Sequence, residues 1–252
     1  LRQMANVALY PANTLTAADI AEFAPDHVAL ATGSSWTRLL YSSLEIPVDE
    51  MQGPQVYTPT DLAAGNWPSE GPVLVYDYDN YYMGGLVAEG LADRGLAAVY
   101  ATSAGHVSAW TVMTNEQPYV HQALSERGVA RHTLSLLKSF DNGAACLADM
   151  YSGQETPIEA AAVVIVGTRL PNDDLYHQLR DGETTTGATP FKSLRRIGDA
   201  LAPGALVHAV YSGQEFSQQL GADRNELYLR DLPITEHSPS AAYVSPEERE
   251  NV

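Results

Sequence analysis

Residues 71–102 contain the feature that most restricts how this chain can fold. Residues 73–76 form an apolar run that suits a strand buried on both faces. After an irregular turn, apolar residues recur at helical spacing until Gly95, which sits where a helix C-cap belongs. A second strand is expected at residues 97–102. The stretch therefore predicts two parallel strands joined by a helix, the β-α-β unit of Rossmann-like folds.

The turn between the first strand and the helix lacks the glycines of a dinucleotide site. Such a site uses Gly-x-Gly-x-x-Gly, which lets the backbone approach a pyrophosphate. Here Asp77 and Asp79 stand where phosphates would lie, and only Gly84 matches the last glycine. Thr102 and Ser103 end the second strand without an acid for a ribose or an arginine for a 2′-phosphate. We therefore expect a Rossmann unit kept as a scaffold, without nicotinamide binding.

The charge of the chain excludes several classes of function. Its 252 residues include 31 acidic and 14 basic side chains, which give a formal charge of −17. Such a surface repels nucleic acid and anionic membranes, and it serves solubility or steers a basic partner. Cys146 is the single cysteine, so no disulfide framework, zinc site or iron–sulfur cluster is expected. No apolar run of about 18 residues and no signal peptide are present, which favours a cytoplasmic protein.

Further elements are expected on both sides of the β-α-β unit. Residues 27–32 and 162–167 are apolar runs followed or ended by glycine, a weak internal repeat consistent with two Rossmann-like halves. An antiparallel hairpin is expected within residues 129–166, because Asp-Asn-Gly and Ser-Gly turns separate its apolar runs. Other expected elements are strands at 7–10 and 194–197, helices at 16–22, 58–64, 114–128, 173–179 and 203–220, loops at 34–55 and 181–189, and an extended C-terminal tail.

Four short motifs resemble one flavoprotein family. They read ATGSSW at residues 31–36, DNYYM at 79–83, LVAE at 86–89 and IGDALAP at 197–203. Their order and spacing are similar to the C-terminal part of the trimethylamine dehydrogenase group, within the NADH:flavin oxidoreductase (Old Yellow Enzyme / 2,4-dienoyl-CoA reductase) family. The resemblance implies an α/β, Rossmann-like FAD/NAD(P)-binding fold of the disulfide-reductase type, in which an NAD-like domain interrupts an FAD-like domain.

The resemblance also implies a division of the chain. A partial FAD-like domain is expected at residues 1–67, the NAD(P)-like Rossmann insert at 68–179, and the return to the FAD-like domain with the C-terminal tail at 180–252. The family places a barrel with FMN and an iron–sulfur cluster upstream of such domains. Neither the barrel nor the cluster cysteines are present, and the chain opens at Leu1 without a start signal. We therefore expect a fragment of a longer protein.

The resemblance implies a flavin-dependent oxidoreductase of the amine dehydrogenase or demethylase type. The FAD-like domain would bind FAD or ADP when whole, and the fragment alone is expected to be inactive. The missing barrel, an electron-transfer flavoprotein and further copies of the chain are the expected partners. The alternative is a non-catalytic module of the same fold that serves as a scaffold or a partner-binding surface.

Four residues are the expected cofactor-binding positions: Thr32, Gly33, Gly198 and Asp199. In the wider flavoprotein fold such an aspartate lies near the ribityl or pyrophosphate group, and the helix after it offers free N–H groups. A structural role stays open for each pair, because these residue types also form simple turns. No catalytic residue is expected, since the seven histidines are scattered and no Gly-x-Ser-x-Gly motif occurs.

An aromatic group leaves a further choice open. Tyr76, Tyr78, Tyr81, Tyr82 and Trp110 form either an aromatic core of the insert or an electron-transfer or partner patch. We favour the core, because buried aromatic side chains commonly dominate protein cores.

Overall fold

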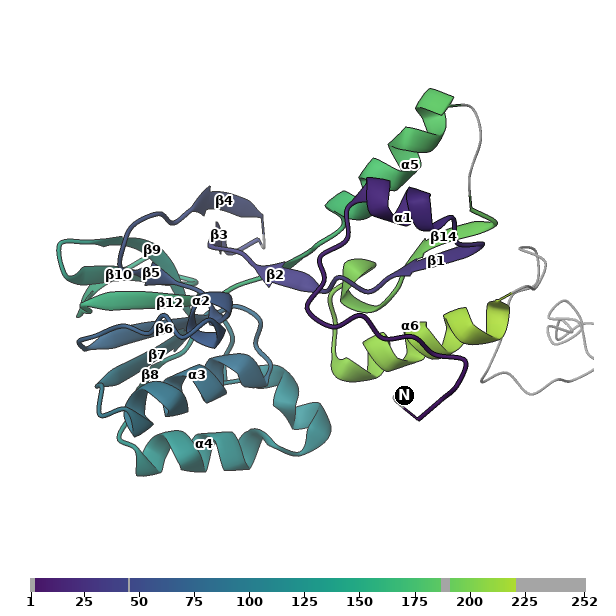
Figure 1. Cartoon of the computed structure of the whole chain (residues 1–252). Helices are drawn as coiled ribbons and strands as arrows, with labels where there is room; N and C mark the ends of the chain where they lie inside the picture. Colours follow the sequence, from purple (N-terminus) through teal and green to yellow (C-terminus); the bar gives the residue numbers. More distant parts are fainter. Residues whose placement is uncertain (1–2, 45, 187–190, 221–252) are drawn as a thin grey trace, which may run out of the picture.

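A computed structural model describes residues 3–44, 46–186 and 191–220, which form two lobes of unequal size (Figure 1). The larger lobe is built on a five-stranded parallel sheet of order β5-β12-β6-β7-β8. The helix α3 (Tyr82–Asp93) joins β6 to β7, so the expected β-α-β unit is confirmed. The strands are β5 (Val56–Tyr57), β6 (Val73–Asp77), β7 (Ala98–Thr102), β8 (Ala130–His132) and β12 (Ala162–Val166).

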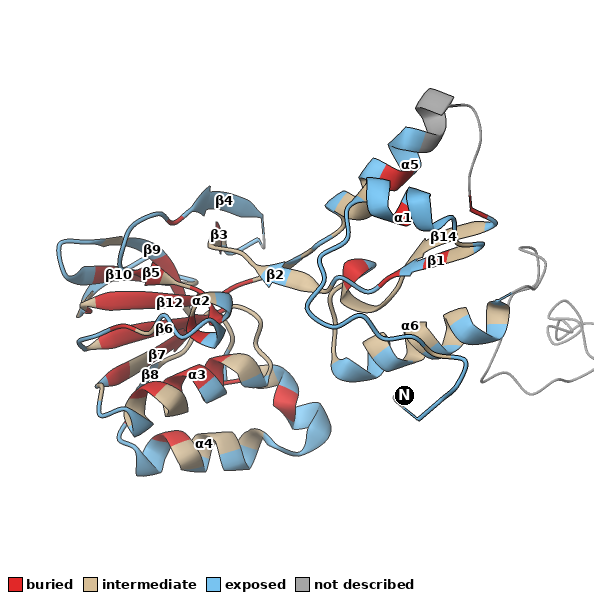
Figure 2. Cartoon of the chain, in the orientation of Figure 1, coloured by how far each residue is buried: buried red, intermediate tan, exposed pale blue. Residues whose placement is uncertain are grey.

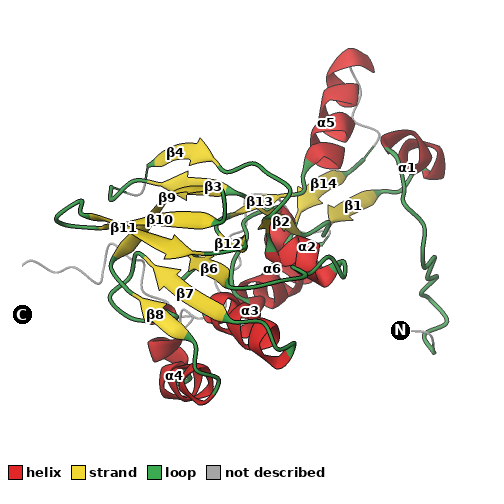
Figure 3. Ribbon diagram, turned by 90° about the vertical axis from the view of Figure 1, so that its left-hand side faces the viewer, coloured by secondary structure: helices red, strands yellow, loops and turns green. Residues whose placement is uncertain are grey.

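Both faces of this sheet are covered, which explains why its central strands are apolar throughout. Every residue of β6 and β12 is buried, as Figure 2 shows. On one face, α3 and α4 (Gln117–Glu126) bury Leu91 and Leu124, and the short 3-10 helix η1 (Ala109–Thr114) leads into α4. On the other face lies an antiparallel sheet, whose strands are labelled in Figure 3. It contributes Leu137 and Leu147 to the core. Its strands are β9 (Ser135–Asp141), β10 (Ala144–Asp149) and β11 (Glu155–Glu159), which confirms the expected hairpin.

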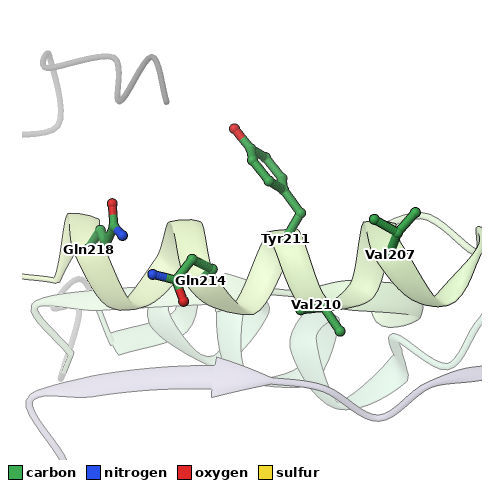
Figure 4. Close-up of a pocket in the computed structure, with 5 residues that line it drawn as sticks. All are labelled: Val207, Val210, Tyr211, Gln214 and Gln218. Atoms are coloured by element: carbon green, nitrogen blue, oxygen red, sulfur yellow. The ribbon is translucent and has the colours of Figure 1, made fainter. Parts of the chain in front are cut away.

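The smaller lobe has a smaller core. Its β1 (His27–Leu30) and β14 (Ser193–Arg196) form a two-stranded parallel sheet. The helices α1 (Ala17–Phe23) and α5 (Asp174–Thr186) pack on this sheet through Ile20 and Leu179. The helix α6 (Leu206–Gln219) has no buried residue. Its side chains line a shallow hollow of about 370 Å³, shown in Figure 4: Val207, Val210, Tyr211, Gln214 and Gln218.

Two antiparallel strands connect the lobes. β2 (Ser34–Trp36) leads the chain into the larger lobe, and β13 (Arg169–Pro171) leads it back. A second antiparallel pair, β3 (Leu39–Tyr41) and β4 (Pro47–Glu50), follows β2. The expectation that residues 34–55 form a loop is therefore wrong. These strands have only three or four residues each, too few for an alternating apolar pattern to stand out.

Two helices begin where side-chain caps predict. Thr16 caps α1 together with Asp19, and Thr58 caps α2 (Pro59–Ala63) together with Asp61. In both cases the threonine side chain accepts a bond from the aspartate N–H, and the aspartate carboxylate accepts one from the threonine N–H. This reciprocal arrangement satisfies two backbone donors that a helix start otherwise leaves without partners.

Several other expected boundaries are wrong. Residues 7–10 form no strand, because no described strand pairs with them and they are mostly exposed. The helix α5 continues to Thr186, through most of the loop expected at 181–189, since a helix anchored by buried Leu179 propagates at little cost per residue. α6 begins at Leu206, beyond Pro203, and η2 (Gly198–Ala200) precedes it. Residues 187–190 and the whole of the expected tail, which falls within 221–252, lie outside the described residues.

The larger sheet extends across one expected domain boundary. β5 precedes residue 68, yet it pairs with β12 in the larger lobe. The division at residues 67 and 68, like the one at 179 and 180, stays a prediction. Across the described part of the chain, no helix is both long enough and apolar enough to span a membrane.

Candidate functional site

Two loops meet at one edge of the small sheet. Leu30 and Arg196 are paired at the carboxyl ends of the parallel strands β1 and β14, and the N–H of Ile197 donates to the carbonyl of Leu30 at 2.9 Å. Residues 32–33 and 198–199 leave the sheet directly after these strand ends. The structure thus brings the four expected cofactor-binding residues to a single sheet edge, the place where open parallel sheets bind ligands.

The two glycines are needed for backbone conformation. Gly33 has φ = 77° and Gly198 has φ = 58°, values in the left-handed region that L side chains rarely adopt. A Cβ atom on Gly33 would meet no heavy atom within 4 Å, so the chain beside it is open on that side. The N–H of Gly198 donates to the Oγ of Ser212 on α6 at 3.0 Å. An open glycine at a strand end fits a site where a ligand approaches the backbone.

Asp199 is the most connected residue of this edge. Its Oδ2 accepts hydrogen bonds from the Oγ of Ser34 at 3.1 Å and from Nη1 of Arg169 at 2.9 Å. Its Oδ1 accepts one from the N–H of Gly204 at 3.2 Å. The carboxylate thereby links the first residue of β2, the strand β13 and the turn before α6. Its side chain is 24% exposed, so it remains within reach of solvent or a ligand.

Arg169 is the residue of this site that sequence reasoning missed. Besides binding Asp199, its Nη2 donates to the carbonyl of Gly204 at 2.9 Å. Its guanidinium lies 5.2 Å from the ring centre of Trp36, within cation–π range. The sequence offers one weak signal, namely that Arg169 closely follows the apolar strand β12 and Gly167. Its partners become visible only when β2, β13 and η2 are assembled.

Thr32 is engaged within the chain. Its hydroxyl donates to the carbonyl of Asn172, and its own carbonyl accepts from Nδ2 of Asn172 at 3.3 Å. The carbonyl of Gly33 accepts from the N–H of Asn172 at 2.9 Å. These bonds hold the loop after β1 against the chain that leaves β13. The hydroxyl proton of Thr32 is thereby used within the chain, whereas its exposed oxygen can still accept a hydrogen bond from a ligand.

In the turn between β6 and α3, the side chain of Asp77 lies inside the protein. Asp77 is fully buried, and its carboxylate accepts from the Tyr100 hydroxyl and, at 3.0 Å, from the N–H of Asn80. Burial raises the pKa of Asp77 to about 7. The expectation that Asp77 faces a phosphate position is therefore wrong, because its side chain lies beneath the helix start. Burial also raises the pKa of Asp79, although the positive charge of Arg169 lowers it.

The expected aromatic group is divided between core and surface. Tyr76 is fully buried, and the ring of Tyr78 stacks on Tyr41 with a centroid separation of 4.2 Å. Tyr82 and Trp110 are 42% and 59% exposed. The core expectation thus holds for Tyr76 and fails for Trp110. Among the residues that the structure describes, no group of three or more potential ligands could hold a metal ion.

Comparison with known proteins gives relatives of one kind. No model of a known protein family matches the chain. Dimethylamine dehydrogenase from Hyphomicrobium sp. (strain x) is 26% identical over 227 residues, which cover 82% of this chain and 31% of that protein. Histamine dehydrogenase from Rhizobium sp. 4-9 superposes with a TM-score of 0.81 at 32% identity, covering 94% of this chain and 35% of that one. The chain is homologous to the C-terminal part of the trimethylamine dehydrogenase-like flavoproteins.

A second solved relative extends this trimethylamine dehydrogenase-like homology. The 6-hydroxypseudooxynicotine amine oxidase from Pseudomonas geniculata N1 is 35% identical, with a TM-score of 0.81 over 88% of this chain and 33% of that one. The chain thus spans about a third of the length of these relatives. A more distant likeness to the flavoprotein disulfide reductase RclA from Escherichia coli, with a TM-score of 0.51, confirms the FAD/NAD(P)-binding, disulfide-reductase-like fold.

Proposed function

We propose that the chain supplies the nucleotide-binding-like domains of a flavin-dependent oxidoreductase that acts on amines. The observation that carries the proposal is the meeting of residues 32–33 with residues 198–199 at the carboxyl edge of a parallel sheet. Relatives named as amine dehydrogenases and an amine oxidase share this fold at 26–35% identity, which supports the class of substrate. Because the chain spans a third of their length, the activity belongs to a complete protein.

The ligand of this edge is the adenosine diphosphate part of FAD, or ADP itself. Asp199 would accept a hydrogen bond from a ligand hydroxyl, and the open side of Gly33 would let the ligand lie close to the backbone. The N-terminus of α6, the positive end of its dipole, follows η2 after the turn that Asp199 and Gly204 bound. A bound flavin would supply electron-transfer chemistry, whereas the residues of this chain bind and orient.

The rest of the protein is proposed from the resemblance. A barrel with FMN and an iron–sulfur cluster would hold the amine-oxidising centre, and an electron-transfer flavoprotein would accept the electrons. We also propose a cytoplasmic homo-oligomer. Size-exclusion chromatography with metal and flavin analysis of the complete protein would test this composition directly.

The test of the ligand site is a pair of variants of the complete protein. Asp199→Ala removes the carboxylate at the proposed site, and Asp79→Ala removes an acid from the turn of the larger lobe. After gel filtration, released nucleotide is quantified by chromatography. We expect loss of nucleotide in Asp199→Ala and retention in Asp79→Ala. Equal retention in both variants would contradict the role of Asp199, and selective loss in Asp79→Ala would move the site into the larger lobe.

A further inference from the structure

We infer that Arg169 is a positioning residue that fixes Asp199 for its ligand and couples this site to the linker between the lobes. The inference rests on the proposed function, because it concerns the same nucleotide site. It assigns a role to a residue on β13, outside both loops that carry the expected cofactor-binding positions.

The first argument is the pattern of bonds that Arg169 makes. One guanidinium nitrogen binds Asp199 and the other binds the carbonyl of Gly204, both at 2.9 Å. These two partners are the ends of the turn at residues 199–204, which leads into α6. Arg169 therefore clasps the turn at both ends, and the side chains of Arg169 and Asp199 are only 22% and 24% exposed. A planar fork with two parallel donors suits this geometry, whereas a lysine ammonium is a single point of charge.

The second argument is the acceptor capacity of the Asp199 carboxylate. A carboxylate has about four lone-pair sites, two on each oxygen. Ser34 and Arg169 use both sites on Oδ2, and the Gly204 N–H uses one site on Oδ1. Within the part of the chain that the structure describes, one site on Oδ1 remains for a ligand hydroxyl. Arg169 thereby decides which oxygen of Asp199 meets the ligand.

The third argument is the place of Arg169 between the lobes. The chain passes from the smaller lobe to the larger along β2 and returns along β13, and Arg169 pairs with Trp36 across these strands. Its guanidinium also lies over the Trp36 ring, and its charge acts on Asp79 at the turn of the larger lobe. Any change in the β2–β13 linker therefore displaces a group that holds Asp199. Conversely, a ligand that stabilises Asp199 in place stabilises the linker.

The experiment compares Arg169→Ala, Arg169→Lys and Arg127→Ala in the complete protein. Arg127 is the matched control, because it forms an ion pair with Asp93 at 2.9 Å in the larger lobe, away from the linker. ADP is the probe, since it is the part that FAD shares with the other dinucleotides. Calorimetry measures its affinity, and hydrogen exchange of residues 34–37 and 199–204 measures order in the linker and the turn, with and without ADP.

We expect Arg169→Ala to lower ADP affinity at least tenfold and to raise exchange in both segments. Arg169→Lys should restore part of the affinity, and Arg127→Ala should change neither readout. In the unaltered protein ADP should slow exchange in the linker, and this effect should vanish in Arg169→Ala. Unchanged exchange in the turn of Arg169→Ala, or ADP affinity within twofold of the unaltered protein, would overturn the inference. An unaltered protein that binds neither ADP nor FAD would overturn the proposed function. Hydrogen exchange of residues 199–204 would then still show whether Arg169 orders the turn.

Discussion

Gly84 is a residue whose replacement the larger lobe cannot absorb without movement. A Cβ atom at this position would lie 2.5 Å from Cγ of Asp77 and 2.7 Å from its Cβ. The neighbour is a fully buried side chain held by two hydrogen bonds, so it has nowhere to move. The last glycine of the turn is thus kept for close packing of helix on strand, although the nucleotide turn around it is closed.

Gly84→Ala should therefore destabilise the larger lobe by about 1–3 kcal/mol, the usual cost of overpacking a core. Gly213→Ala is the matched control, because Gly213 lies within α6 and a Cβ there would meet nothing within 4 Å. This control should stabilise its helix by about 0.5–1 kcal/mol. Urea unfolding of both variants measures the two effects, and equal signs would contradict the packing argument.

Asp77 should make stability depend on pH. Its pKa of about 7 in the folded chain lies above the ordinary carboxyl value of 3.8, so the folded state binds more protons between these values. The stabilising contribution of the protonated form is present at low pH and is lost as pH rises through about 7. Asp77→Asn cannot ionise, so its free energy of unfolding should change less over this window.

Urea unfolding from about pH 4 to pH 7 provides the measurement. The control is Asp93→Asn at the end of α3, because the hydrogen bond from Arg127 holds the pKa of Asp93 below its ordinary value. Asp93 therefore titrates on the acid side of this window and is already ionised near neutral pH, so its replacement should leave the slope near neutral pH unchanged. If the free energy of unfolding changes with pH in the same way for Asp77→Asn and the unaltered chain, the pKa of Asp77 does not differ between the folded and unfolded states.

Residues at strand ends were predictable from the sequence, whereas their partners were not. Gly33 and Asp199 could be nominated because each follows an expected strand within a motif of the family that the chain resembles, and the carboxyl ends of parallel strands share one edge. Arg169 could not be nominated, because its three partners come from segments far apart in the chain. The inward direction of Asp77 was equally hidden, since the sequence gives the turn but not the side on which the carboxylate lies.

At the scale of elements, strong local signals predicted structure and weak ones did not. The buried strands β6 and β12, and the capped helices α1 and α2, were found from apolar runs and capping residues. The strands β2 to β4 were missed because they owe their pairing to contacts with each other and with β13, and not to their own sequence. The extent of α5 was missed because its Gly- and Thr-containing end resembles a loop.

The turn between β6 and α3 should not bind nicotinamide nucleotides. The buried carboxylate of Asp77 accepts from the N–H of Asn80, and the N–H of Trp110 donates to the carbonyl of Asn80 at 2.8 Å. Asp79 adds negative charge, and the ring of Tyr82, which is 42% exposed, stands at the start of the helix. A phosphate therefore meets acids and rings where it would need free N–H groups.

Calorimetry with NADH and with NADPH should accordingly give no measurable heat of binding. Asp79→Asn is a useful companion, because removing one charge leaves the buried carboxylate in place and should not create a site. Micromolar binding of either nucleotide to the unaltered chain would contradict this view of the turn.

At the scale of the whole molecule, most of the hydrophobic core and the proposed ligand site lie in different lobes. The larger lobe has the extensive core, while the smaller lobe has the proposed ligand edge on only two described strands. A Gly-rich phosphate turn is absent from the sequence, although backbone N–H groups of such a turn supply much of the binding to a pyrophosphate.

The 252-residue chain purified alone should therefore carry no tightly bound flavin. Asp199, Gly33 and the start of α6 offer contacts to one side of a ligand, which is too little to hold it through purification. Absorbance spectra of the purified chain, with denaturation to release any cofactor, provide the measurement. A stoichiometric flavin band would show that the described residues suffice for binding.

The pairing of β2 with β13 also affects how such a protein can change during evolution. Ser34 lies opposite Pro171, and facing residues of antiparallel strands have Cα atoms about 5 Å apart. The chain therefore enters and leaves the larger lobe at almost the same point, as it does in an inserted domain. Because the entropic cost of closing a loop grows slowly with its length, the stability of the smaller lobe depends little on the length of the inserted segment. The larger lobe can therefore lose a nucleotide-binding turn, or acquire another ligand, while β1 and β14 remain paired.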